Sequence, residues 1–254
     1  MFDAAYIIEL ESLYRNEHVT EGAREFTEAL SVNHLPYVII TEQTGRERKL
    51  IAQKLNDHGL RTIRPGDIYT SAMAAVDYLL SANARKRRAL MIGGRGLKAA
   101  LDQGGFVITE DHPDYLFVAM NRNMTYSDYC GALEAINDGA EIISTDNRRT
   151  QWSDGNRIIG NASIVHMLEY ASGTRAVSTG RGSRNLFLSA QNYLQKKTDE
   201  ILMVGTGFRT DILPAEELGY ATCLVTEGRD ITEMGVNDDT HPDYIVDDLA
   251  GLTK

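Results

Sequence analysis

Residues 200–205 read Glu-Ile-Leu-Met-Val-Gly, a short apolar run closed by glycine that is typical of a buried β-strand. Residues 220–226, Tyr-Ala-Thr-Cys-Leu-Val-Thr, form a second such run on its C-terminal side. Toward the N-terminus, Tyr6-Ile-Ile8 and the run at residues 35–41 are similar, and a helical pattern at residues 22–31 separates them. Strands and helices that alternate in this way predict parallel βαβ units.

A second set of strands and helices lies in the middle of the chain. Its candidate strands are residues 89–93, 106–108, 115–120 and 140–144. Because this second set of strands and helices lies between the two halves of the first, the sequence predicts a core domain that is interrupted by an insertion. We therefore expect an α/β protein with a core domain at residues 1–79 and 176–254 and an inserted α/β cap at residues 80–175.

Composition excludes several classes of protein. The net charge of −10 argues against a nucleic-acid binder, because a phosphate backbone needs a basic surface. No apolar run approaches the roughly 18 residues that suggest a membrane span. The two cysteines, Cys130 and Cys223, lack the spacing of a redox or metal motif. We expect a reduced, cytoplasmic protein with no nucleic-acid or membrane partner.

Several short segments, in this order, carry a resemblance to a known family. They are Leu13-Tyr14-Arg15 with Glu21-Gly22-Ala23, Pro36–Thr41, Ser144–Thr150, Gly160–Ile164, Leu202–Gly205 with Thr210–Ile212, and Pro242–Leu249. Over nearly its whole length the chain resembles the haloacid dehalogenase superfamily, and within it the NagD-like, p-nitrophenyl-phosphatase type. The resemblance implies a Rossmann-like parallel-sheet core, an inserted α/β cap and magnesium-dependent phosphatase chemistry.

The resemblance also implies where the catalytic residues fall. The family's nucleophilic Asp, at the end of the first strand, and its acidic Asp two residues later correspond to Glu9 and Glu11 when the motif is aligned from the strand. An alignment from Leu13-Tyr14 puts the same positions on Ile8 and Leu10 instead. Two further residues that hold phosphate oxygens in the family, a Thr or Ser and a Lys, correspond to Thr41 and Arg181.

The fourth motif departs most from the family. The expected metal-binding Asp is Thr206, and a later acidic position is Arg209. Only Asp211 remains, so any metal ligands would be Glu9 and Asp211. Glu42, directly after Thr41, adds a negative charge near any bound phosphate.

These replacements predict that the magnesium-dependent reaction is lost. An added methylene moves a carboxylate by about 1 Å, and such a misplacement can cost roughly 100-fold in rate. Magnesium wants near-ideal octahedral oxygens at about 2.0–2.1 Å. We expect no cofactor, and Mg²⁺ only if activity is retained. We further hypothesise that Arg209, with Arg181, pairs with Glu9 or Glu11 in place of the metal, the alternative being that these side chains point into solvent.

Three functions remain open. The first is a non-catalytic phosphatase homologue that acts as a binding, scaffold or regulatory protein, a homodimer through the cap, with a small phosphorylated or anionic ligand or a protein partner. The second is a hydrolase of a small phosphorylated metabolite with Glu9 as nucleophile and Glu11 as acid. The third, a Rossmann-type nucleotide-binding protein, lacks the G-x-G-x-x-G spacing at residues 91–97. Thr41, Glu42, Arg209 and Trp152 are candidate ligand-binding residues, and Trp152 could instead anchor the dimer or pack in the fold.

Overall fold

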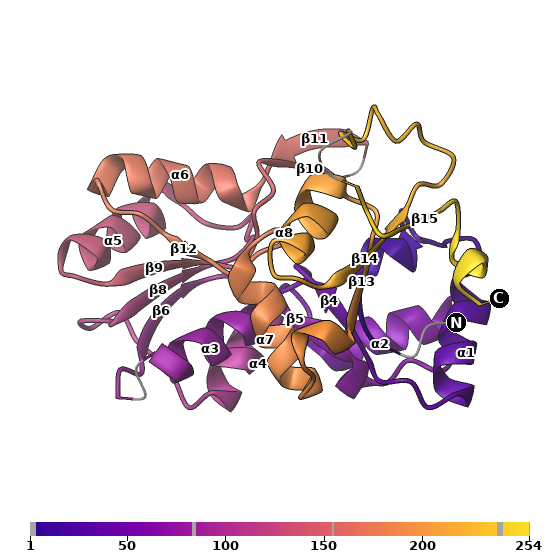
Figure 1. The fold of residues 1–254 in the computed structure, drawn as a ribbon. Coiled ribbons are helices and arrows are strands. Elements are labelled where there is room, and N and C mark those ends of the chain that lie inside the picture. Colours follow the sequence, from indigo (N-terminus) through magenta and orange to yellow (C-terminus); the bar gives the residue numbers. More distant parts are fainter. Residues whose placement is uncertain (1–3, 83–84, 154, 238–240, 254) are drawn as a thin grey trace. The chain divides into compact units, whose positions relative to one another are not determined.

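The computed structural model describes residues 4–82, 85–153, 155–237 and 241–253 (Figure 1). Contacts within the chain divide it into two compact units. Residues 1–41, 48–69 and 182–254 form what we name the core unit, and residues 42–47 and 70–181 form the inserted unit. Each unit is built on a parallel sheet with helices, so the predicted α/β class is confirmed.

The boundaries of these units differ from those predicted, which confined the cap to residues 80–175. Helix α3 (Ser71–Ala82) belongs to the inserted unit because its apolar side chains, Leu79 among them, join a buried cluster with Phe117. At the other boundary, the Thr179 hydroxyl donates to the Ser71 carbonyl oxygen at 3.0 Å. The unit therefore begins before and ends after the predicted cap, since both flanking segments pack on it.

The core unit holds a six-stranded sheet in the order β15-β14-β13-β1-β4-β5. These strands are β1 (Ala5–Glu9), β4 (Tyr37–Thr41), β5 (Ile68–Thr70), β13 (Ile201–Gly205), β14 (Ala221–Val225) and β15 (Tyr244–Val246). Strand β1 lies parallel to both β13 and β4, with Ile8 opposite Val204 and Ile39. A short antiparallel hairpin, β2 (Tyr14–Arg15) and β3 (His18–Val19), follows β1.

Burial explains why most of these strands could be found from sequence. Every residue of β1 and β13 is buried, as expected for parallel strands that are covered on both faces and therefore read as continuous apolar runs. The strands predicted near residues 6, 37, 201, 221 and 244 are confirmed. Strand β5 was missed because its three residues run directly into α3.

Four α-helices complete the core unit within the residues that the structure describes. They are α1 (Ala23–Val32), α2 (Arg48–Asp57), α7 (Arg184–Leu194) and α8 (Leu213–Glu216). Short helical turns lie at Leu10–Ser12, Pro65–Asp67, Thr198–Glu200, Phe208–Ile212 and Leu249–Leu252. Helix α1 packs through Phe26, whose ring meets that of Tyr6 edge-on at 5.6 Å between centroids. Helix α7 lies against β1 and β4.

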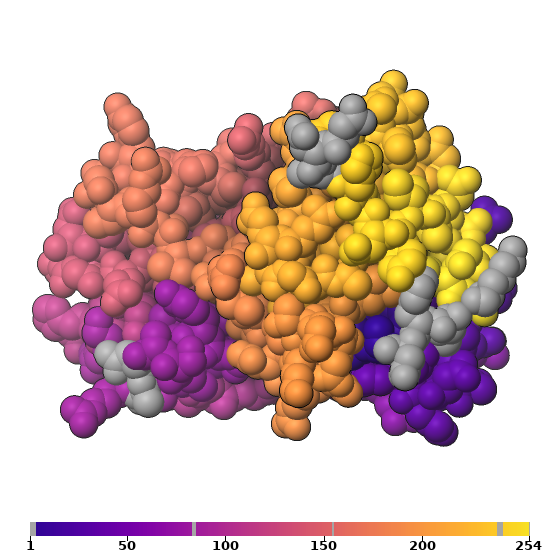
Figure 2. Space-filling model, viewed as in Figure 1, coloured from indigo at the N-terminus to yellow at the C-terminus, as the bar shows by residue number. Residues whose placement is uncertain are grey.

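The N-terminal and C-terminal segments meet in the core unit. Indigo and yellow surfaces lie side by side in Figure 2, and the Leu249 amide donates to the Glu21 carbonyl oxygen at 3.3 Å. Gly22 makes this approach possible. Its φ is +73°, and an added Cβ would lie 2.1 Å from the backbone nitrogen of Ala250.

We expect Gly22→Ala to lower the free energy of unfolding by at least about 2 kcal/mol, because it adds a steric clash with the backbone to the strain of a left-handed alanine. Urea denaturation followed by circular dichroism measures the change. Gly228→Ala is the matched control, since Gly228 has φ +72° in the same unit and nothing within 4 Å of an added Cβ. That control should cost about 1 kcal/mol. Equal losses in both variants would show that the contact with Ala250 is unimportant.

The inserted unit holds a five-stranded parallel sheet in the order β12-β9-β8-β6-β7. Its strands are β6 (Arg88–Ile92), β7 (Val107–Ile108), β8 (Tyr115–Val118), β9 (Glu141–Ser144) and β12 (Val177–Ser178). The four strands predicted from the sequence in this region are confirmed, and the two-residue β12 was not predicted. An antiparallel hairpin, β10 (Thr150–Ser153) and β11 (Asn156–Ile159), follows β9.

Helices cover both faces of this second sheet (Figure 1). Helices α3 and α4 (Arg95–Gln103) share one buried cluster with the sheet, and α5 (Tyr126–Asn137) and α6 (Asn161–Ser172) share another. Three aromatic rings, Phe106, Tyr115 and Phe117, meet edge-on in the first cluster. No helix within the described residues is long and apolar enough to cross a membrane.

Candidate functional site

Three polar residues lie on the side of the core sheet where its parallel strands end. Strand β1 ends at Glu9, β4 ends at Thr41, and Thr206 follows the end of β13. Because the strands are parallel and in register, these residues lie along one edge, where ligands bind in open α/β sheets. All three are buried. The edge therefore presents one carboxyl group and two hydroxyl groups.

The turn after β1 forms a hydrogen bond with the Glu9 side chain. The Glu9 carboxylate accepts a hydrogen bond from the Glu11 amide at 2.9 Å and caps the helical turn Leu10–Ser12. Ile8 and Leu10 lie in the apolar core of the unit. Their burial there favours the alignment that places Glu9 and Glu11, rather than Ile8 and Leu10, at the sheet edge.

Two charged residues, buried Asp211 and exposed Arg229, form hydrogen bonds with the backbone directly after β13. Asp211 is fully buried, and its Oδ2 accepts a hydrogen bond from the Gly207 amide at 2.8 Å. Arg229, which the sequence did not single out, donates from Nη2 to the Thr206 carbonyl oxygen at 3.1 Å and from Nε to the Thr226 carbonyl oxygen at 2.8 Å. Arg229 therefore ties the ends of β13 and β14 together. Arg229 follows β14 closely, but its partner Thr206 lies 23 residues away along the chain, so no local pattern signalled this role.

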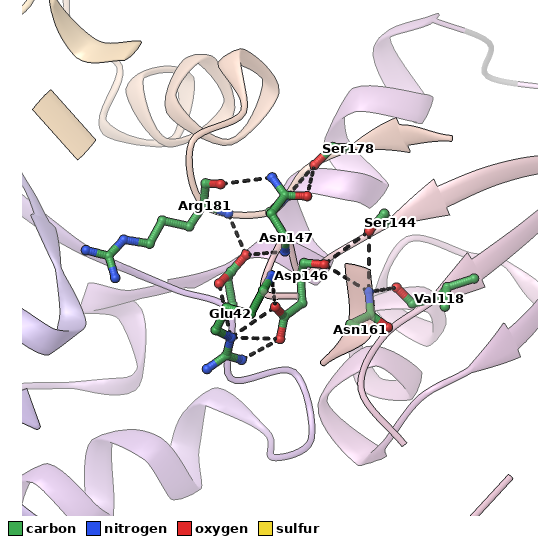
Figure 3. A network of polar contacts seen from close by, with 10 residues as sticks. Glu42, Val118, Ser144, Asp146, Asn147, Asn161, Ser178 and Arg181 are labelled. Atoms are coloured by element: carbon green, nitrogen blue, oxygen red, sulfur yellow. Dashed lines mark hydrogen bonds and ion pairs between the residues drawn. The ribbon is translucent and has the colours of Figure 1, made fainter. Parts of the chain in front are cut away.

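A second polar cluster lies in the inserted unit (Figure 3). The Glu42 Oε1 atom accepts hydrogen bonds from the Asn147 amide at 2.8 Å and the Arg181 amide at 2.7 Å. Its Oε2 atom lies 3.5 Å from the Arg148 guanidinium. Burial, and then the nearby Asp146 carboxylate, raise the pKa of Glu42 to about 7, although Arg148 and the two amides act in the opposite direction.

Asp146 is the second carboxylate of this cluster. It is fully buried, and its Oδ1 atom accepts hydrogen bonds from the Arg148 amide at 2.9 Å and from Arg148 Nε at 3.0 Å. Arg148 Nη2 pairs with Oδ2 of the same carboxylate. Nδ2 of the buried Asn161 side chain donates to the Asp146 carbonyl oxygen at 3.0 Å. We name Glu42, Asp146 and Arg148 the Glu42 cluster.

The Arg181 backbone is held on both sides in the inserted unit. Its amide donates to Glu42, and its carbonyl oxygen accepts from Asn147 Nδ2 at 2.9 Å. The Ser178 hydroxyl donates to Asn147 Oδ1 at 2.7 Å and so orients that side chain. Gly180 lets the carboxylate approach, since an added Cβ would lie 2.6 Å from Glu42 Oε1.

Comparisons with known proteins agree with this architecture. A family model described as haloacid dehalogenase-like hydrolase matches residues 12–107, and one described as HAD-hydrolase-like matches residues 179–252. The acid sugar phosphatase of Staphylococcus epidermidis is 28% identical over 247 residues, which cover 96% of this chain and 95% of that protein. The structure of NagD from E. coli K-12 superposes with a TM-score of 0.89 at 25% identity and 98% coverage of both chains. The family-model matches and these relatives support a place for this chain in the haloacid dehalogenase superfamily, among the NagD-like proteins.

A further structural relative is consistent with this assignment. A mutant of the thermostable p-nitrophenylphosphatase from Bacillus stearothermophilus superposes with a TM-score of 0.89 at 27% identity, again covering 98% of both chains. The family resemblance implies a magnesium ion at the edge of the core sheet.

The described residues do not fit a magnesium site of the haloacid dehalogenase type. Glu9 and Asp211 each accept a hydrogen bond from a backbone amide of their own turn, and Thr206 supplies no charge. Within the described ranges, no three or more His, Cys, Asp or Glu side chains are grouped to hold a metal ion. Magnesium requires nearly ideal octahedral oxygens and is normally bound by one or two carboxylates together with substrate phosphates.

Arg209 does not take the place of a metal at this edge. Its side chain is exposed and passes close to Gly235. No ion pair joins it to Glu9 or Glu11 in the part of the chain that the structure describes. The hypothesis that Arg209 balances these carboxylates is therefore wrong, because the short turn at Phe208–Ile212 directs this side chain outward.

Trp152 lies on β10 and is 69% exposed, so the interpretation that it packs in the fold is wrong. The Arg157 guanidinium stacks over its ring at 5.5 Å from the centroid. Alternation along the hairpin explains the exposure, since Thr150 and Trp152 point away from the unit. A role in ligand or subunit binding stays a prediction.

Proposed function

We propose that this chain is a phosphatase homologue without magnesium-dependent phosphatase activity, and that it acts as a binding, scaffold or regulatory protein. The observation that carries the proposal is Thr206, a buried residue at the end of β13 where the family resemblance predicts a metal-binding Asp. The loss of that carboxylate removes one negative charge from a site that must attract Mg²⁺.

The second candidate is a working phosphohydrolase that acts on a small phosphorylated metabolite, with Glu9 as the nucleophile. The observation in its favour is that Glu9 pairs in register with Ile40 and so lies beside Thr41, the residue expected to hold phosphate oxygens. The curated relative named acid sugar phosphatase makes a sugar phosphate the first substrate to test.

Hydrolysis of p-nitrophenyl phosphate and of a sugar phosphate, each with and without Mg²⁺, separates the two candidates. We expect the wild-type protein to show no more turnover than Glu9→Gln, because neither would form a phosphoryl-enzyme. Glu169→Gln is the control for preparation, since Glu169 belongs to the inserted unit and accepts a hydrogen bond from the Ala176 amide. Turnover that survives Glu169→Gln and disappears in Glu9→Gln would overturn the proposal.

We expect the triple variant Glu9→Asp, Glu11→Asp, Thr206→Asp to gain magnesium-dependent turnover of at least about 100-fold over wild type. Two of the changes move a carboxylate back by about 1 Å, and the third adds the carboxylate that is expected to bind the metal. A thermal shift with Mg²⁺ gives a second readout, since a ligand that binds only the native state raises stability. The wild-type protein should show no such shift. A magnesium-dependent shift in the wild type equal to that of the triple variant would contradict the proposed loss of the metal site.

We further propose that the protein acts as a homodimer through the inserted unit, with exposed Trp152 in the interface, and binds a small phosphorylated or anionic compound. Both cysteines are free thiols, which is compatible with the cytoplasmic location we propose. Light scattering during gel filtration of wild type and Trp152→Ala gives the mass of each. A monomeric wild-type protein at micromolar concentration would rule out the dimer.

A further inference from the structure

The Glu42 cluster holds two carboxyl groups and one guanidinium group. The side chains of Asp146 and Glu42 are both buried, with exposed fractions of 0% and 7%. Arg148 is the only cation paired with them in the described residues of the inserted unit. Asp146 takes most of this cation, since both of its oxygens bind the guanidinium. Glu42 is left with a longer approach of 3.5 Å to Arg148 Nε.

Backbone amides supply the rest of the stabilisation of the Glu42 carboxylate. One Glu42 oxygen receives both the Asn147 and the Arg181 amides, and Gly180 leaves room for it. In Figure 3 the Arg181 guanidinium extends away from the carboxylate, so only its backbone contributes. The charged groups that face Glu42 are therefore Asp146 and Arg148, both from the segment after β9.

Hydrogen bonds to an ionised acceptor are roughly twice as strong as those between neutral groups. The two amides are thus held most firmly when Glu42 carries its charge. Burial and the Asp146 carboxylate oppose that charge and raise the pKa of Glu42 to about 7, so the carboxyl group exchanges its proton close to neutral pH. The hydrogen bond from the Arg181 amide to Glu42 therefore changes in strength with pH near neutrality.

We propose that Glu42 is a positioning residue that fixes the Gly180–Arg181 segment through its ionised carboxylate and loosens this hold when the carboxylate takes up a proton. Arg181 occupies the position where the family resemblance predicts the phosphate-holding Lys. The segment connects β12 to the rest of the chain, so its backbone geometry sets where the Arg181 side chain begins. This property goes beyond the proposed function and does not depend on whether the chain hydrolyses phosphate esters.

Backbone NMR of the uniformly labelled full chain, titrated from pH 5.5 to 8.5, tests the proposal. The amide resonances of Asn147 and Arg181 are expected to titrate together with a midpoint near pH 7. In Glu42→Gln the amide oxygen can still accept both hydrogen bonds, but it carries no titrating proton. Both resonances should then become insensitive to pH in that range, in a protein that remains folded.

Glu169→Gln is the matched control, because Glu169 also accepts a backbone hydrogen bond in the inserted unit, from the Ala176 amide at 2.8 Å. Hydrogen bonds from that amide and from His166 lower the pKa of Glu169 in spite of its partial burial. The titration of Asn147 and Arg181 should be unchanged in this variant. Amides that do not titrate in the wild type, or that titrate equally in Glu42→Gln, would overturn the proposal.

Discussion

Replacing Arg148 with alanine is expected to lower the free energy of unfolding by about 3–5 kcal/mol, because it leaves a buried charge without its partner. Asp146 is fully buried, and Arg148 is the cation that binds both of its oxygens. Glu42 would lose the same cation, which approaches it at 3.5 Å. Urea denaturation followed by circular dichroism and by the fluorescence of Trp152, the only tryptophan, measures the loss.

A control and a second variant identify the cause of this loss. Arg122 is exposed and donates to the Ser153 hydroxyl at 2.8 Å in the same unit, so Arg122→Ala should change stability by less than about 0.5 kcal/mol. Adding Asp146→Asn to Arg148→Ala should recover part of the loss, since it removes the unpaired charge. A loss no larger than that of Arg122→Ala would mean that water replaces Arg148 without penalty.

Replacing Glu42 with glutamine is expected to change the pH dependence of stability. The native state holds the Glu42 proton up to about pH 7, whereas the ordinary pKa of 4.5 applies to the unfolded chain. Stabilisation from this proton is therefore complete below about pH 4.5 and disappears as the pH rises through about 7. Glutamine undergoes no such change. Relative to wild type, the variant should gain about 2–3 kcal/mol in free energy of unfolding between pH 5 and pH 8.

Urea denaturation of both proteins at pH 5, 6, 7 and 8 measures this difference. Asp128→Asn controls for the loss of a hydrogen-bonded carboxylate in the same unit. A hydrogen bond from the Thr125 amide at 2.7 Å lowers the pKa of Asp128, so the effect of this variant should be constant over this range. A Glu42→Gln curve that runs parallel to the wild-type curve would show that Glu42 is ionised throughout, and would remove the physical basis for a proton-dependent hold on Arg181.

Local patterns in the sequence were sufficient for most of the fold. Strands β1, β4 and β13 are buried on both faces, so each appears as an apolar run that needs no knowledge of its neighbours. The positions of Glu9, Thr41 and Thr206 at strand ends follow from the same runs. The boundaries of the two units could not be derived from the sequence. Helix α3 is apolar enough to pack on either sheet, and only its contacts assign it to the inserted unit.

What the sequence alone determined is the α/β class and the order of the main strands, and it predicts that three aspartates of the family are replaced by Glu9, Glu11 and Thr206. What only the tertiary structure decided is the Glu42 cluster. Glu42 is separated by 105 residues from Asn147 and by 139 from Arg181, so no spacing rule could join them. The reason is physical: strand periodicity is a local property of the backbone, whereas the pKa of a carboxyl group depends on burial and on charges that folding alone brings near.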